Sequence, residues 1–197
     1  MNNPKSTPDR LISQSWIAAV AMIMMIAVSL FDPLHNPLTQ HMSELATGSW
    51  WTAIAVRVLP GIMGLSIMAF GLGCLGRNAI WTGISGVLFG AAMLANGIFP
   101  TGNPLHGLYG LAIFSVLVPV FYAAELNPPP ALRQLCFAAS FVALIYMWGL
   151  LAGFEPAALR GVTQRVASLV AFGWFLLPAF AQKNAPPKLK KARAYFR

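Results

Sequence analysis

The chain alternates long apolar runs with short polar connections. A helix needs about 20 apolar residues to cross the hydrocarbon core of a bilayer, and six runs approach that length. They cover about residues 11–31, 50–75, 79–99, 105–124, 131–154 and 164–180. The pattern therefore predicts an all-α, polytopic membrane protein in which residues 1–197 form a single domain, a bundle of six transmembrane helices.

The composition excludes an ordinary soluble domain, because the chain is 57% hydrophobic and only 9% charged. We expect no cleavable signal peptide, since the first run is too long and Asp32-Pro33 follows it in place of a small-residue cleavage site. Much of the formal charge of +8 lies in a basic tail over residues 182–197. We interpret this tail as a topology signal that also contacts anionic lipid, and not as a nucleic-acid site.

Basic residues are unevenly distributed between the two sides of this predicted bundle. Six spans place both termini on the same side, which takes ten of the thirteen basic residues. The opposite side takes Arg57, Arg160 and Arg165. Because positive charge marks the cytoplasmic side, we expect both termini inside, in the cytoplasmic (inner) membrane.

A polar stretch separates the first two spans. Asn36 can cap and Pro37 can open a short helix that ends at Gly48, and its apolar residues fall on one stripe. We therefore expect a short interfacial helix here, lying on the bilayer. His41 and Glu44, at i and i+3, can contact each other on its neighbouring face.

Two further polar loops are predicted on the same outer face. In the turn after the third span, Asn103 caps the next helix and places His106 at its third position, where the helix dipole favours a neutral imidazole. The other loop precedes the last span. We expect the polar residues of this face to converge on one cavity open to the outer leaflet; they are Asp32, His35, His41, Ser43, Glu44, Arg57, Asn96, Asn103, His106, Glu155, Gln164 and Arg165.

Three motifs occur in order along the chain. They are Ser43-Glu44-Leu45, Gly97-Ile98-Phe99-Pro100 followed by His106, and Gly161 with Gln164-Arg165. This set resembles the signature of the bacterial and archaeal membrane family catalogued as domain of unknown function 998, over nearly the whole chain. That signature is a Ser-Asp/Glu-Leu-Gly loop, a Gly-x-Phe-Pro turn with a following histidine, and a Gly-x-x-Glu-Arg start of the last helix. The resemblance implies a fold and a site location, while the family's function is not established.

The chain departs from this signature at two positions. Ala46 replaces the loop glycine, and Gln164 stands where the family often has glutamate. The second change removes a carboxylate and weakens an acid/base role at that position.

The first functional hypothesis is binding of a lipid headgroup or another small amphiphile in the outer pocket. Guanidinium groups form two parallel hydrogen bonds to phosphate or carboxylate, which suits this role. The candidate ligand-binding residues are Arg57, Ser43, Glu44, His106, Gln164 and Arg165. A purely structural alternative pairs Arg57 with Glu44 or Asp32, and Arg165 with Glu155.

The second hypothesis is a metal-dependent intramembrane hydrolase that acts on a lipid. His41 and His106, with a carboxylate from Asp32 or Glu44, have the composition of a zinc site, although no HExxH motif is present. Ser43, Glu44 and His106 are then the candidate catalytic residues. Ligation of haem by His41 and His106 is a third hypothesis for these two histidines.

A third class is a structural partner subunit of a membrane assembly. Gly86 and Gly90 form a GxxxG step that lets two helices approach closely. If this face were exposed, it would favour a partner subunit; if it were buried, it would be internal packing.

Overall fold

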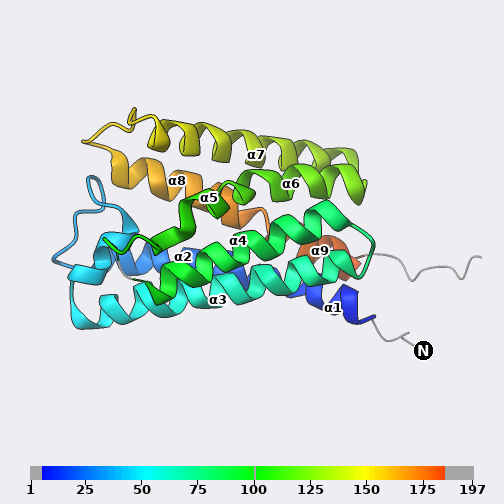
Figure 1. The fold of residues 1–197 in the computed structure, drawn as a ribbon, viewed down its shortest axis with the longest axis horizontal. Helices are drawn as coiled ribbons and strands as arrows, with labels where there is room; N and C mark the ends of the chain where they lie inside the picture. Colours follow the sequence, from blue (N-terminus) through cyan, green and yellow to red (C-terminus); the bar gives the residue numbers. More distant parts are fainter. Residues whose placement is uncertain (1–5, 100, 185–197) are drawn as a thin grey trace, which may run out of the picture.

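The structure of the chain is a computed structural model that describes residues 6–99 and 101–184. Within those ranges it contains helices and loops and no strand. The long helices lie side by side along one axis (Figure 1). In chain order the elements are α1 (Thr7–Ser13), α2 (Trp16–Phe31), the 3-10 helix η1 (Met42–Thr47), α3 (Trp50–Leu75), α4 (Ile80–Ile98), the 3-10 helix η2 (His106–Leu108), α5 (Tyr109–Ala112), α6 (Phe114–Glu125), α7 (Pro130–Leu151), α8 (Arg160–Gly173) and α9 (Leu176–Asn184).

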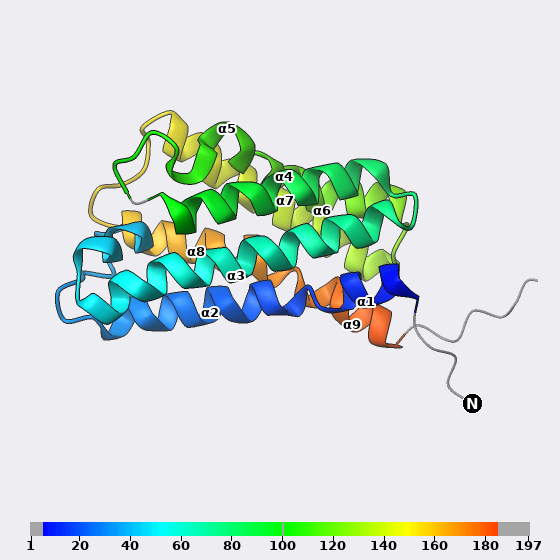
Figure 2. The ribbon, with the colours of Figure 1, turned by 60° about the horizontal axis from the view of Figure 1, so that its bottom comes forward.

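The helices form a closed ring in chain order. α2 packs against α3, α3 against α4, α4 against α6, α6 against α7 and α7 against α8, and α8 returns to α2. α1 and α9 contact each other at one end of the ring, where both ends of the described chain also lie (Figure 2). We call this the terminal end. The opposite end, which holds η1 and the connection from α7 to α8, is the loop end.

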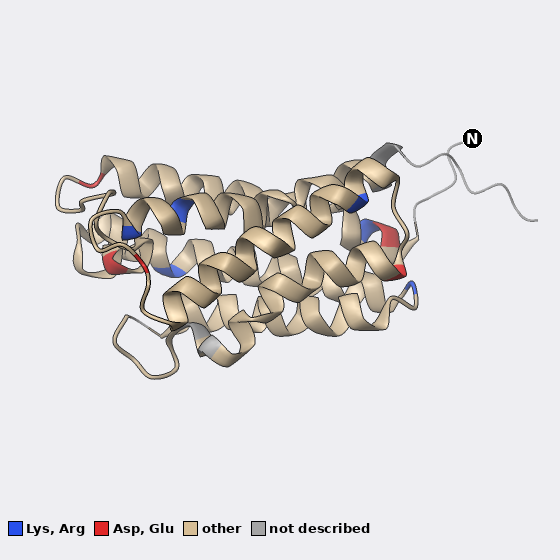
Figure 3. Ribbon diagram, turned by 90° about the horizontal axis from the view of Figure 1, so that it is seen from above, with Lys and Arg blue, Asp and Glu red and all other residues tan. Residues whose placement is uncertain are grey.

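Five helical segments are long and apolar enough to cross a membrane. They are Thr7–Phe31, Trp50–Leu75, Ile80–Ile98, Pro130–Leu151 and Arg160–Ala181. The predicted fourth span is a shorter apolar segment, Gly110–Glu125, so six spans stay a prediction. Acidic and basic residues lie toward the two ends of the bundle and leave its middle uncharged (Figure 3). The all-helical architecture is confirmed, and it is compatible with a membrane helix bundle.

The fourth predicted span is also broken. The sequence places Asn103 as the cap of one helix from residue 105 to 124, but η2, α5 and α6 divide this run. Leu108 has a φ of 38°, in the left-handed region, and a residue in that conformation interrupts a right-handed helix. Asn103 does accept a hydrogen bond from the backbone N–H of Leu105 at 2.9 Å, which is a local turn instead of a helix cap.

The first and last predicted spans are each divided near the terminal end. The break between α1 and α2 is bonded to neighbouring helices: Gln14 Nε2 donates to Ser66 O at 2.9 Å, and Ser15 Oγ donates to Phe175 O at 2.8 Å. Phe175 lies in the break between α8 and α9. Side chains at the first break therefore satisfy the carbonyl of Phe175 at the second break and that of Ser66 in α3, as a membrane interior requires. Residues 185–197 of the predicted basic tail lie outside the described residues.

The predicted interfacial helix is shorter than expected. The pattern predicts a helix from Pro37, but residues 37–41 are turns and loop, and only η1, Met42–Thr47, is helical. The carbonyls that a longer helix would use are bound by the start of α8: Arg165 Nη1 donates to the carbonyls of Pro37 and Gln40, and the Gly161 N–H donates to that of Leu38. Tertiary hydrogen bonds thus replace helical ones.

The small-residue face of α4 packs inside the chain. A Cβ added at Gly90 would lie 2.6 Å from Gly64 O of α3, and one added at Gly71 of α3 would lie 2.7 Å from Gly83 O. Gly86 and Gly90 are buried in this contact, so they provide no exposed face for a partner subunit.

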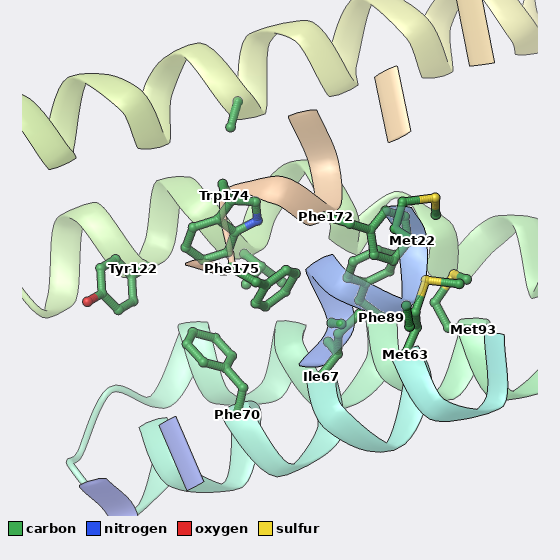
Figure 4. Close-up of a cluster of buried hydrophobic side chains, with 14 of the residues drawn as sticks. Met22, Met63, Ile67, Phe70, Phe89, Met93, Tyr122, Phe172, Trp174 and Phe175 are labelled. Carbon is green, nitrogen blue, oxygen red and sulfur yellow. The ribbon is translucent and has the colours of Figure 1, made fainter. Parts of the chain in front are cut away.

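An aromatic cluster fills the ring toward the terminal end. Phe70 meets Phe175 edge-to-face with ring centroids 5.2 Å apart, and it meets Trp174 in the same way at 5.9 Å. Figure 4 shows these rings with Tyr122 beside them, and three methionine side chains beyond Phe89 on the far side. The interior therefore changes character along the axis, from aromatic rings to thioethers.

Candidate functional site

Three segments that are distant in sequence meet at the loop end. His41 Nε2 lies 2.8 Å from Glu155 Oε2, which joins the loop before η1 to the connection between α7 and α8. Thr101 Oγ1 donates to Ser43 O at 2.7 Å and so ties the turn after α4 to η1. The structure thus brings together the three loops whose polar residues the sequence placed on one face.

Glu44 fastens η1 to the start of α8. Its Oε1 accepts from the His41 N–H at 2.9 Å and from Arg160 Nη2 at 3.1 Å, and the Nε of Arg160 donates to Thr39 O. From the sequence alone, Arg160 served only to assign the topology. Its structural role was not predicted, because its partners come from a loop more than a hundred residues earlier. In the structure Glu44 holds the loop in place, and its carboxylate is bonded within the loop end.

Arg165 organises the buried side of the same loop. Its guanidinium donates to five acceptors at 2.7–3.1 Å: Ser29 Oγ, His35 Nε2, and the carbonyls of Pro37, Gln40 and Gly161. A guanidinium has five N–H donors in one plane, whereas the ammonium group of lysine has three donors on a single nitrogen and could not bond all five acceptors. The predicted pairing of Arg165 with Glu155 is wrong, since Glu155 instead bonds His41 and accepts from Thr163 Oγ1 at 2.9 Å.

His35 is a neutral acceptor in this cluster. Because a guanidinium only donates, the His35 Nε2 that lies 2.8 Å from Arg165 Nη2 must accept, and the proton of the ring is on Nδ1. Burial and then the nearby Arg165 charge lower the pKa of His35 from its ordinary value. The loop therefore depends on an unprotonated histidine.

Asp32 caps α3 and is not available to a ligand. Its carboxylate accepts from Thr52 Oγ1 at 2.6 Å, from the Ser49 N–H at 3.1 Å and from the Leu34 N–H at 2.9 Å. These hydrogen bonds, the one from Thr52 above all, lower the pKa of Asp32 to about 2. The bond from Ser49 also satisfies one of the backbone N–H groups that have no partner within the helix at the start of α3.

A half-open cavity of about 200 Å³, the central cavity, lies between the helices of the ring and next to η1 and η2. Methionine is its commonest lining residue, and six of the nine methionines of the chain contribute: Met22, Met25, Met42, Met63, Met93 and Met147. They come from five different elements, so no single stretch of sequence reveals them. Thioether side chains are flexible and polarisable, and they adapt to apolar ligands of different shapes.

Polar side chains also line this cavity. Those named by the sequence are His41, Ser43, Asn96, His106 and Gln164, and the structure adds Ser168 and Tyr146. Asn96 Nδ2 donates to Met93 Sδ at 3.6 Å, where the polar and thioether linings meet. The cavity wall is thus amphipathic.

His106 presents an acceptor to the cavity. Its Nδ1 lies 2.8 Å from Phe99 O, and because a carbonyl only accepts, Nδ1 carries the proton. In the neutral ring Nε2 is then an acceptor, and no other described residue bonds it. The carbonyl of Phe99 therefore sets the tautomer of His106.

Gln164 and Ser43 supply further hydrogen-bonding groups. Gln164 Oε1 accepts from the Met42 N–H at 2.7 Å, which leaves its amide NH₂ as the donor. Among the described residues, neither this NH₂ nor the Ser43 hydroxyl has a hydrogen-bond partner. Both groups are therefore available to whatever occupies the cavity, ordered water included.

Arg57 lies apart from these residues. It is exposed on α3, beside Ile54 and Val58, which are also exposed, and it has no hydrogen bond or ion pair with any described residue. The predicted structural pairing with Glu44 or Asp32 is wrong, because both carboxylates are bonded elsewhere. An arginine at this position reaches the headgroup region by extending along the helix.

The proposed zinc ligands are not brought together. Within residues 6–99 and 101–184, no three His, Cys, Asp or Glu side chains are grouped closely enough to hold a metal ion. His41 and His106 line one cavity, but His41 Nε2 is bonded to Glu155, and Asp32 and Glu44 point to other partners. The donor set therefore does not fit zinc. The bond from His41 Nε2 to Glu155 also occupies the nitrogen that would ligate haem.

No family model, curated protein or solved structure matches this chain. The resemblance to the domain of unknown function 998 family thus stays a prediction from three motifs. The structure does give each motif a local role, since Glu44, His106 and Arg165 all hold or line the same end of the bundle.

Proposed function

We propose that this membrane protein binds a small amphipathic molecule in its central cavity. The apolar part of the ligand lies among the methionines, and its polar part is bound by His106, Gln164 and Ser43. One observation carries the proposal: six thioethers line the same cavity as groups whose hydrogen-bonding capacity no other described residue uses. Ligand sites commonly combine an apolar wall with a few convergent polar groups.

Arg165 and Glu44 have an indirect role in this proposal. They fix the loop that carries His41 and Ser43, and so they position the polar wall without lining the cavity. We propose that the protein resides in the cytoplasmic membrane with both termini inside. The excess of basic residues on the side of the termini supports this orientation, as does the position of both described chain ends at one end of the bundle.

Native mass spectrometry of the protein released in detergent tests the binding proposal. We expect a non-covalent adduct on the wild-type protein. Ser168→Phe, which fills the cavity from α8, should remove it, and His106→Ala should weaken it by removing the acceptor. Arg57→Gln, on the exposed face of α3, is the matched control and should keep it. Equal adducts in all four proteins, or none in the wild type, would contradict the proposal.

A hydrolase is the alternative function, favoured by the presence of Ser43 and His106 on the same cavity wall. In such a site the unprotonated His106 Nε2 would act as the base for the Ser43 hydroxyl. Hydrolysis of a short-chain nitrophenyl ester that is lost in both Ser43→Ala and His106→Ala would establish this function. An adduct at the mass of zinc, lost in His106→Ala, would restore the metal-dependent form.

A further inference from the structure

A second hollow, an apolar groove of about 460 Å³, lies at the seam between α7 and α8. Side chains of both helices form its walls, among them the exposed Ile145, Trp148 and Val166. Its polar lining is confined to Tyr146, and to Glu155 and Thr163 near the loop end. Glu155 is already bonded to His41 and Thr163, so the groove presents no unpaired charge to a ligand.

The groove and the central cavity share a wall. Tyr146 and Leu150, one turn apart on α7, line both. On α8, neighbouring residues line different spaces. Thr163 and Ala167 line the groove, whereas Gln164 and Ser168, each the next residue along the chain, line the cavity. The two spaces therefore lie next to each other across the α7–α8 seam.

A polar pair joins the two spaces at the loop end. His41 lines the cavity, Glu155 lines the groove, and their side chains are 2.8 Å apart. An amphiphile whose chain lies in the groove thus has its polar end next to the polar wall of the cavity.

We propose that the α7–α8 groove binds the hydrocarbon chain of a single-chain, membrane-soluble amphiphile and is the lateral entrance to the central cavity. This inference rests on the proposed binding function and names its ligand class. The sizes of the two spaces support it. A cavity of about 150 Å³ accommodates benzene, so the central cavity of about 200 Å³ holds a polar end with a short apolar part and not a long chain. The remaining chain needs a continuous apolar surface, which the groove supplies.

Gly149 allows the groove to be filled without disturbing the fold. A Cβ at this position would have no atom within 4 Å, and the residue lines the groove but not the cavity. Gly61 of α3 has the same open surroundings and lines neither space, so it is the matched control. Replacing a helical glycine also favours the helix, so neither variant is expected to unfold.

Two photoreactive probes test the inference in phosphatidylcholine vesicles. The first is hexadecanoic acid with a diazirine at mid-chain, and the second is the same acid with the diazirine beside the carboxyl group. The first should label the groove residues of α7 and α8, and excess unlabelled acid should suppress this labelling. The second should label the cavity residues Asn96 and Ala112. Gly149→Trp should strongly reduce both kinds of adduct, and Gly61→Trp should leave both unchanged.

The outcomes separate the two proposals. If the carboxyl-end probe labels the cavity equally in Gly149→Trp and wild type, the entrance is wrong and the binding cavity stands. If mid-chain labelling of the groove is no more saturable than labelling of Ile54 and Val58 on the lipid-facing side of α3, the groove is ordinary lipid contact and the inference fails. If the carboxyl-end probe never labels the cavity, both proposals fail for this ligand class.

Discussion

The two ends of the bundle interior are built on different principles. Toward the terminal end, rings such as Phe70 and Phe175 meet at favourable angles and leave little space. Toward the loop end, thioethers and polar side chains surround a cavity, and hydrogen bonds donated by Arg165 and accepted by Glu44 fix the loops around it. Packing therefore stabilises one end, whereas a polar framework supports the other and leaves room for a ligand.

The largest expected effect is at the aromatic end. Phe70→Ala should lower the free energy of unfolding by about 3–5 kcal/mol, because it leaves a cavity among rings that cannot close around it. Met63→Ala should cost less, about 2 kcal/mol, since Met63 already borders an open space and has fewer contacts to lose. Reversible unfolding in detergent measures both values. A larger loss for Met63→Ala would show that the methionine end is the packed one.

The polar framework should be nearly as sensitive. Arg165→Ala leaves the carbonyls of Pro37 and Gln40 without their donor, and each unsatisfied buried acceptor costs about 1–3 kcal/mol. We expect a total loss of about 3 kcal/mol in the same unfolding measurement. Arg165→Lys should not restore it, because an ammonium group cannot reach five acceptors in one plane. Full stability of the lysine variant would mean that only the charge matters.

The same framework predicts a pH effect. The folded state lowers the pKa of His35 below its unfolded value of about 6.5. Its contribution to stability is therefore complete above that pH and is lost as the pH falls through the folded-state pKa. Thermal unfolding should show a loss of stability in mildly acidic buffer. His35→Gln, which keeps an acceptor for Arg165 but does not titrate, should have a flatter profile; an unchanged profile would assign the effect to other groups.

The smallest expected effect is that of Arg57. Its side chain is exposed and unbonded among the described residues, so Arg57→Gln should change the free energy of unfolding by less than about 0.5 kcal/mol. The contrast with Arg165→Ala, measured side by side, tests whether the two arginines differ as the structure indicates. A large loss for Arg57→Gln would place Arg57 in a contact at the loop end.

The sequence predicts the helices whose limits are local. The span Trp50–Leu75 begins and ends where expected, because Ser49 and Gly76 flank a long, mostly apolar run. The breaks at Gln14 and at Phe175 are not predictable in this way, since they depend on hydrogen bonds between helices that are distant in sequence.

For the site as well, local sequence patterns predict only the residues that lie within one short segment. Motifs within one loop identified Glu44 and His106, but the methionine lining draws one or two residues from each of five elements and has no local pattern. The sequence also did not show that Arg57 is exposed whereas Arg165 is buried. α3 is apolar on all sides, so periodicity does not show which of its faces is exposed.

An experimental density map of the protein in a lipid nanodisc tests the central claim most directly. We expect elongated non-protein density in the cavity, in contact with His106 Nε2 and extending among the methionines toward Tyr146 and Leu150. Density for isolated waters alone, or methionine side chains collapsed into the space, would contradict it.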